Sequence, residues 1–123
     1  MSLFNKEPKR NSDINSLNLN FRTKLKSLIH LMYKDGFDPI IFEAKRSQER
    51  QQYLYSIGRT IQKNRKPVTW TLKSKHFTGN AADIISKSYG WDWPTFFAAL
   101  KLHAKEVGLQ TLVQEGCHVQ MPF

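Results

Sequence analysis

Four polar residues in the second half of the sequence have the chemical types that zinc catalysis requires. His76 and Asp83 lie seven residues apart in a polar segment, and His118 follows Glu115 by three residues near the C-terminus. A catalytic zinc ion needs three protein ligands and one open position for water, together with a carboxylate that accepts a proton from that water. His76, Asp83 and His118 would supply the ligands, and Glu115 would be the proton acceptor.

Spacing alone does not single out this set of residues. The chain has four histidines and ten acidic residues, so several other combinations of three ligands and a base are available. On spacing alone, the better interpretation is a loop histidine at His76 and a histidine that hydrogen-bonds near a sheet edge at His118. His30 and His103 lie on predicted helices beside apolar positions, and we assign them no function.

Hydrophobic periodicity and turn residues predict the elements in the first half of the chain. Apolar residues at helical spacing over 21–32 predict a first helix, which stops at Gly36. A short apolar strand is predicted over 39–43. Ser47 then caps a second helix, which stops at Gly58.

The second half combines short strands with one more helix. Residues 59–66 are basic and polar and predict a loop, and strands are predicted over 68–71 and 81–85. Pro94 begins a helix with apolar residues at helical spacing, and Gly108 ends it.

Two final strands are predicted over 109–113 and 117–121, with a tight hairpin turn through 114–116. Helices and strands do not alternate regularly along the chain, as they would in a parallel fold. We therefore predict an α+β fold in which helices flank a small antiparallel sheet. A zinc site formed by the residues named above would lie on the sheet face. Residues 1–123 are predicted to form a single catalytic domain, with 1–16 as an irregular lead-in.

Composition excludes several classes of protein. With 40% hydrophobic and 12% aromatic residues, the chain has the composition of a globular domain and not of a disordered or repeat protein. No run approaches the roughly 18 apolar residues that cross a bilayer, and the N-terminus lacks the apolar segment of a secretory signal. Cys117 has no partner for a disulfide, and strand alternation points it away from His118, so we interpret it as a small buried apolar residue.

The charge balance indicates a polyanionic partner. Nineteen Lys and Arg residues against ten acidic ones leave a net charge of +9. Nucleic acid and the anionic polymers of a bacterial cell wall both fit this charge, which reports attraction and not chemistry. The basic residues fall in short clusters instead of forming a helix-long stripe, and such clusters are usually a solvated face.

Three ordered motifs add a family resemblance. Ser-x-His-x-x-Gly-x-Ala-x-Asp spans 74–83, and Glu-x-x-His followed by Val-Gln spans 115–120. Upstream, Arg-Ser-x-x-x-Gln-x-x-Leu-Tyr-x-x-Gly-Arg-Thr spans 46–60. Together with their flanks, these motifs cover about 40–120. They resemble the zinc peptidase family of D-Ala-D-Ala carboxypeptidases, vancomycin-resistance D,D-dipeptidases and phage L-alanyl-D-glutamate endopeptidases.

The resemblance implies a role for each residue at a matching position. The residues that resemble the family's zinc ligands are His76, Asp83 and His118. Glu115 resembles its catalytic base, and Arg46 the arginine that assists at the substrate carbonyl. Ser74 and Gln51 are further candidates for orienting the site or binding substrate, although an ordinary cap and a helix-surface amide are equally good interpretations of them.

Two departures from the family pattern affect the choice of substrate more than the metal site. The segment between Gly108 and Glu115 is brief, without the tryptophan- and glycine-rich connection that many relatives carry. Cys117 stands where a proline or aromatic residue is common.

The resemblance implies zinc-dependent hydrolysis of the peptide stems of bacterial peptidoglycan. We expect an L-alanyl-D-glutamate endopeptidase of the phage endolysin type, with Zn²⁺ as cofactor. A D,D-carboxypeptidase acting on D-Ala-D-Ala termini is the nearest alternative. Such an enzyme usually has an export signal or membrane anchor, and neither is visible in the sequence.

A metal-free protein of the same fold, which binds wall polymer or nucleic acid, is an alternative from a different class. A retired enzyme would be expected to lack at least one of the five residues to which the resemblance gives a role. All five are present: His76, Asp83, Glu115, His118 and Arg46. We expect peptidoglycan as the partner, no nucleic acid, no membrane anchor and a monomer. The protein would remain in the host cytoplasm until its release to the wall.

Overall fold

A four-stranded antiparallel sheet forms the centre of the structure, a computed structural model that describes residues 7–67, 75–113 and 115–122. In spatial order, the strands are β1 (Pro39–Glu43), β2 (Ala81–Ser86), β4 (Glu115–Gln120) and β3 (Gln110–Leu112). Every neighbouring pair is antiparallel. The predicted α+β fold with a small antiparallel sheet is therefore confirmed.

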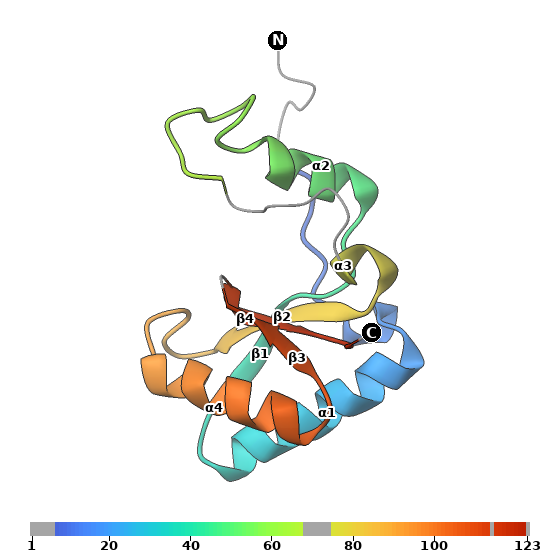
Figure 1. The fold of residues 1–123 in the computed structure, drawn as a ribbon, viewed down its shortest axis with the longest axis vertical. Helices are drawn as coiled ribbons and strands as arrows, with labels where there is room; N and C mark the ends of the chain where they lie inside the picture. The colour runs from blue at the N-terminus through green and yellow to red at the C-terminus, as the bar shows by residue number, and fades with distance from the viewer. Residues whose placement is uncertain (1–6, 68–74, 114, 123) are drawn as a thin grey trace.

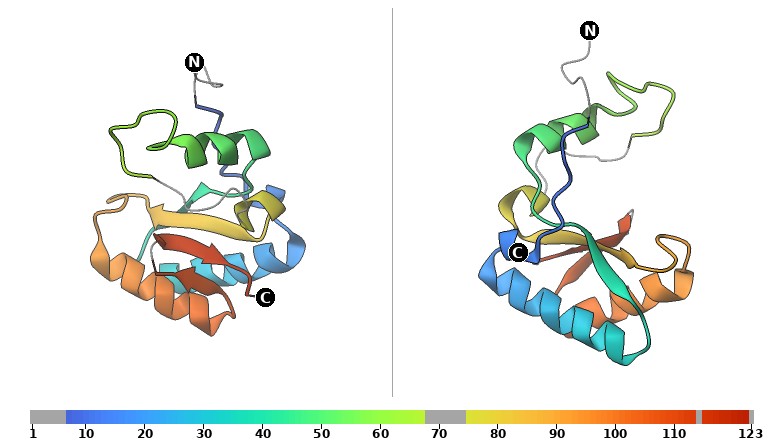
Figure 2. Two further views of the ribbon diagram at one scale, coloured as in Figure 1. Left: turned by 45° about the horizontal axis from the view of Figure 1, so that its top comes forward. Right: turned by 180° about the vertical axis from the view of Figure 1, so that it is seen from behind.

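Helices lie on both sides of this sheet (Figures 1 and 2). The long helices α1 (Leu19–Lys34) and α4 (Pro94–Glu106) cover one face, while α2 (Gln48–Ser56) and the short α3 (Lys75–Thr78) lie toward the other. Within the described residues, none of these helices has the length and apolar character to cross a membrane. The end of the predicted irregular lead-in contains a 3-10 helix, η1 (Ile14–Ser16).

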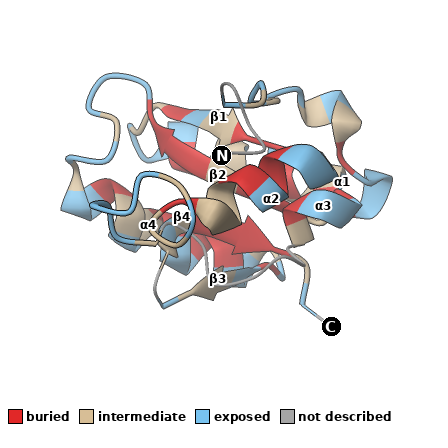
Figure 3. Ribbon diagram, turned by 90° about the horizontal axis from the view of Figure 1, so that it is seen from above, coloured by how far each residue is buried: buried red, intermediate tan, exposed pale blue. Residues whose placement is uncertain are grey.

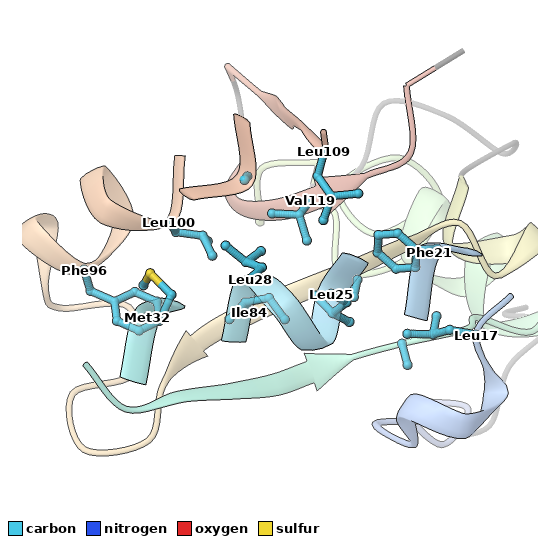
Figure 4. Packing of buried hydrophobic residues seen from close by; sticks show 13 residues of the cluster. Leu17, Phe21, Leu25, Leu28, Met32, Ile84, Phe96, Leu100, Leu109 and Val119 are labelled. Atoms are coloured by element: carbon cyan, nitrogen blue, oxygen red, sulfur yellow. The ribbon is translucent and has the colours of Figure 1, made fainter. Parts of the chain in front are cut away.

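The hydrophobic core lies between the sheet and the two long helices (Figure 4). Phe21, Leu25 and Leu28 from α1 are fully buried, and burial of each such side chain stabilises the fold by about 1.5–3 kcal/mol. Ala82 and Ile84 of β2 face this core. Because alternate residues of a strand point to opposite faces, Asp83 is directed to the other side of the sheet.

Local signals in the sequence mark the helix ends as predicted. Ser47 caps α2, and its Oγ accepts a hydrogen bond from the backbone N–H of Arg50 at 3.1 Å. Pro94 is the first residue of α4. Gly58 follows α2 with φ of +78°, and a Cβ at this position would lie 2.6 Å from the carbonyl oxygen of Arg65. This backbone conformation and close approach require glycine.

The predicted hairpin turn through 114–116 is wrong in its position. Leu112 pairs with Glu115, so Glu115 and Gly116 belong to β4. The preceding pair joins Thr111 to Val119, which means that the strand bulges over 116–118. Acidic and glycine residues favour turns locally, but here they form a bulge, the other common setting for glycine in a strand. The predicted strand over 68–71 lies outside the described residues.

His103 joins the ends of the two long helices. It is buried, and its Nε2 lies 2.5 Å from Oδ2 of Asp35, the residue that follows α1. Its Nδ1 lies 3.2 Å from Oε2 of Glu106 at the end of α4. The hydrogen bond to Asp35 is the largest cause that raises the pKa of His103, and burial opposes it. His103, to which we assigned no function, thus connects α1 with α4 through these two contacts.

The raised pKa of His103 predicts a specific dependence of stability on pH. A group whose pKa is higher in the folded state stabilises that state fully below its unfolded pKa of about 6.5, and the contribution disappears as pH rises through the folded value. We expect the difference in unfolding free energy between wild type and His103→Gln to shrink as the pH rises above about 6.5. Because the carboxylates of Asp35 and Glu106 are half exposed, this difference in unfolding free energy should change by at most about 1 kcal/mol. Urea denaturation at several pH values measures it, and a difference that does not vary with pH would contradict it.

Candidate active site

Three potential metal ligands converge on the sheet face opposite the core. We call these residues, His76, Asp83 and His118, the metal cluster. Asp83 of β2 pairs directly with His118 of β4, and His76 lies on α3, which packs against β2. One potential ligand atom from each residue lies within 4.8 Å of the others. Asp83 Oδ1 is 3.2 Å from His76 Nε2 and 3.4 Å from His118 Nδ1. The convergence that the sequence motifs led us to expect is therefore present.

The second nitrogen of each histidine is held by a protein oxygen. His76 Nδ1 lies 2.9 Å from the carbonyl oxygen of Ala44, and His118 Nε2 lies 2.8 Å from Oε1 of Gln120. Such partners accept the N–H hydrogen and orient the ring, so that the other nitrogen can bind a metal. Gln120 is oriented in turn, because its Nε2 donates to Oε1 of Gln110 at 2.9 Å. Two imidazole nitrogens and a carboxylate, oriented in this way, fit Zn²⁺.

The site stabilises the charged form of Asp83. Burial alone would raise its pKa, but hydrogen bonds to His118 and His76 outweigh burial and hold the pKa far below the ordinary value. For His118, burial favours the neutral ring, but the hydrogen bonds to Asp83 and Gln120, together with the negative charges of Asp83 and Glu115, raise the pKa. A permanent carboxylate is the form that can bind a cation.

Glu115 lies at the edge of this cluster. In a regular strand, residues three apart point to opposite faces, but the bulge over 116–118 brings Glu115 to the side of His118. Its Oε2 lies 4.0 Å from His118 Nδ1. The side chain is 37% exposed, so a bound substrate could reach the carboxylate. The role of proton acceptor that the sequence indicated for Glu115 stays a prediction.

Arg46 follows β1, and its guanidinium is buried beside the metal cluster. Its Nη2 donates to Oε1 of Glu43 at 2.7 Å and lies 3.7 Å from Oδ2 of Asp83. Its Nη1 donates to Oε1 of Gln51, also at 2.7 Å. Gln51 is fully buried, so it orients Arg46 and is not a helix-surface amide. Ser74, the remaining candidate from the sequence, lies outside the described residues.

Glu43 and Arg50 are two residues of the site that sequence reasoning missed. A bulge between Ile41 and Glu43 places Glu43 opposite Asp83, where it is only 2% exposed. Its two oxygens accept from Arg46 Nη2 and from Arg50 Nε. Arg50 is also buried, and its Nη1 donates to the carbonyl oxygen of Pro8. A carboxylate at the end of an apolar strand, with arginines three and seven residues later, was the available signal.

Cys117 is half-buried, so our prediction of a small buried residue is wrong in its degree of burial. Burial is the main cause that raises the pKa of its thiol to about 12, and the negative charges of Asp83 and Glu115 add to it. The thiol is therefore neutral at physiological pH. In this state it is a poor nucleophile, because the thiolate and not the thiol is the reactive form.

Three converging potential metal ligands beside a solvent-accessible carboxylate and a fixed arginine are the arrangement expected of a metal-dependent hydrolase. Comparison with known families makes the class more specific. The VanY family, described as D-alanyl-D-alanine carboxypeptidase, matches residues 14–117. The chain belongs to this family, which confirms the resemblance seen in the sequence motifs and identifies the protein as a peptidase of peptidoglycan peptides.

Solved structures share the fold at low sequence identity. The L-Ala-D-Glu endopeptidase ChiX of Serratia marcescens is 21% identical with a TM-score of 0.65, and the match covers 99% of this chain and 96% of ChiX. VanYB in complex with D-alanine-D-alanine is 18% identical with a TM-score of 0.69, covering 98% and 80% of the two chains. A variant of the D,D-pentapeptidase VanY in complex with Zn(II) is 17% identical, with a TM-score of 0.69 and coverage of 85% and 72%. A search of curated proteins found no match.

The two arginines of the upstream motif should differ in their effect on turnover. Arg46 contacts the metal cluster, whereas Arg59 donates to the carbonyl oxygen of Tyr55 and stacks over its ring at 4.0 Å. We expect Arg46→Ala to lower kcat on peptidoglycan by roughly 100- to 1,000-fold, as for loss of one oxyanion donor. Arg59→Ala is the matched control, with a much smaller loss. Equal losses in two folded variants would contradict this difference.

Removal of the Glu43 charge should destabilise the fold. Glu43→Gln leaves two buried guanidinium groups without their shared carboxylate, and an uncompensated buried charge costs about 3–5 kcal/mol. We expect the unfolding free energy to fall by about 3 kcal/mol in urea denaturation. Glu49→Gln, an exposed change in the first turn of α2, is the control and should change it by less than about 0.5 kcal/mol. Near-equal stability of the two variants would show that the two arginines do not depend on Glu43.

Proposed function

We propose that this protein hydrolyses the stem peptides of peptidoglycan with zinc and acts as an L-alanyl-D-glutamate endopeptidase. The observation that carries the proposal is the convergence of His76, Asp83 and His118 beside Glu115. In this proposal, the three converging residues bind Zn²⁺, Glu115 is the general base and Arg46 assists at the substrate carbonyl. Gln51 positions Arg46, and Ser74 remains a candidate for binding substrate.

The bound zinc ion would act as a Lewis acid that polarises the scissile carbonyl and acidifies water. Glu115 accepts the proton of the attacking water and returns it to the leaving amine. Arg46 donates to the oxygen that becomes negative in the transition state. Because Glu43 and Gln51 already hold the guanidinium, little reorganisation accompanies the reaction, which is the condition for effective electrostatic stabilisation.

The structural match with ChiX supports the endopeptidase assignment, because it covers nearly the whole length of both chains. A D,D-carboxypeptidase is the second candidate, and the description of the matching family favours it. Mass spectrometry of fragments released from purified peptidoglycan separates the two. An endopeptidase releases peptides that begin with D-glutamate, whereas a D,D-carboxypeptidase releases only D-alanine. Release of D-alanine alone would overturn the endopeptidase assignment.

The net charge of +9 supports adsorption to an anionic wall. We propose a lytic role of the endolysin type, in which a monomer is stored in the host cytoplasm and released to the wall. Addition of purified protein to permeabilised bacteria should clear the suspension, and salt should slow the clearing by screening the charge. Failure to reduce turbidity while still cutting purified peptidoglycan would contradict the lytic role.

Two substitutions separate proton transfer from metal binding. Glu115→Gln should keep the zinc content and melting temperature near wild type while losing roughly 100- to 10,000-fold in kcat, because it removes only acid–base assistance. His118→Ala should lose both zinc and activity, since two remaining ligands hold the ion poorly. Elemental analysis, thermal melts and peptidoglycan hydrolysis measure these quantities.

The outcomes discriminate between mechanisms. Loss of zinc in both variants would make Glu115 a ligand instead of a base. Full activity in Glu115→Gln would overturn the peptidase mechanism proposed here and favour a binding role.

A further inference from the structure

His76 is the one residue of the metal cluster that lies outside the sheet. Asp83 and His118 are fixed by the pairing of β2 with β4, whereas His76 is carried by α3. A helix of four residues has too few internal hydrogen bonds to be stable by itself. The position of His76 therefore depends on the contacts that hold α3 and the turn that follows it.

Asn18 makes three hydrogen bonds to the end of α3 and to the turn that leads into β2. Its side-chain Nδ2 donates to the carbonyl oxygen of Thr78 at 3.0 Å and to Oδ1 of Asn80 at 2.9 Å. Its backbone N–H donates to the carbonyl oxygen of Gly79 at 3.0 Å. A single residue, which comes just before α1, thus binds three consecutive residues that follow His76 closely in the chain.

The side chain of Asn18 departs from the usual behaviour of a helix cap. Asn18 is the N-cap of α1, and an asparagine at this position normally accepts a hydrogen bond from a backbone N–H in the first turn of its own helix. Within the part of the chain that the structure describes, its side chain makes no such bond to α1. A local rule that is broken without a local benefit commonly marks a functional position. Here the amide is used on the turn after α3 instead.

The turn fits closely against Asn18 and is connected to the backbone of His76. Gly79 has a φ of +80°, and a Cβ at this position would lie 3.2 Å from the backbone nitrogen of Asn18. The backbone N–H of Gly79 donates to the carbonyl oxygen of His76 at 3.3 Å, and that of Arg46 donates to the same oxygen at 2.8 Å. A displacement of the turn would therefore reach His76 through a single hydrogen bond.

We propose that Asn18 is a positioning residue of the metal site, which holds His76 at the correct distance from the other two ligands. The inference rests on the proposed zinc ligands, and it adds a residue outside the three sequence motifs. Asn18 acts through the turn and not by contact with the ion. The turn also sets the spacing between His76 and Asp83, whose Nε2 and Oδ1 lie 3.2 Å apart, because it joins α3 to β2.

Zinc affinity tests this role in folded protein. Asn18→Ser keeps a side chain that can cap α1, but the serine hydroxyl is too short to replace the amide donor. We expect this variant to bind zinc roughly tenfold more weakly in competition with a chelator of known affinity. The control is Asn20→Ser, an exposed change in the first turn of α1, which should keep the affinity within about twofold of wild type. A residue that only stabilised the fold would not change the affinity of protein that is already folded.

NMR of the metal-free protein tests the positioning directly. The ring signals of His76 should move in Asn18→Ser and stay unchanged in Asn20→Ser, and those of His103 on α4 should stay unchanged in both variants. Equal zinc affinity in the two variants, or His76 signals that do not move in Asn18→Ser, would overturn the role of Asn18.

Failure of the proposed zinc ligands would be visible separately. In that case His76→Ala would retain the zinc content of the wild-type protein. The comparison of metal-free variants by NMR would still decide whether Asn18 positions His76.

Discussion

The pairing of β2 with β4 is the constraint on which the active site depends. Ala82 and Val119 are opposite each other and fully buried against the helices, so the next pair, Asp83 and His118, must point to the other face. The free energy that holds this register comes from the apolar side of the sheet. A slip by one residue would turn His118 into the core and break the metal cluster. Figure 3 shows the buried residues of these central strands in red.

Around this pair, a network of buried charges makes the site rigid. Buried ions stabilise a protein only when they are paired and hydrogen-bonded, and here one carboxylate, Glu43, serves two arginines. Irregularities in the strands make the network possible. The bulge in β1 turns Glu43 toward the site, and the bulge in β4 brings Glu115 to the side of His118. Two departures from regular strand geometry thus place an acidic residue on each side of the metal cluster.

The positive charges of this molecule fall into two groups, exposed charges on the surface and two buried arginines. The net charge of +9 is spread over exposed clusters, where salt screens it, and it can only attract the protein to an anionic surface. Arg46 and Arg50 are different because they are buried and hydrogen-bonded, and Arg46 also lies next to Asp83. Their geometry can orient a substrate, which exposed lysines on flexible stems cannot do equally well.

The sequence by itself determined the fold class, the helix ends and the group of residues that converge on the metal site. Helical periodicity, the Ser47 cap and Pro94 are local signals, and the ordered motifs carried the family resemblance. Only the tertiary structure decided that Glu43 and Arg50 belong to the site, that Gln51 is buried, and where β4 begins. The physical reason is that bulges and the pairing of buried charges depend on contacts such as Glu43 with Asp83, which are forty residues apart in the chain and leave no periodic signal in either segment.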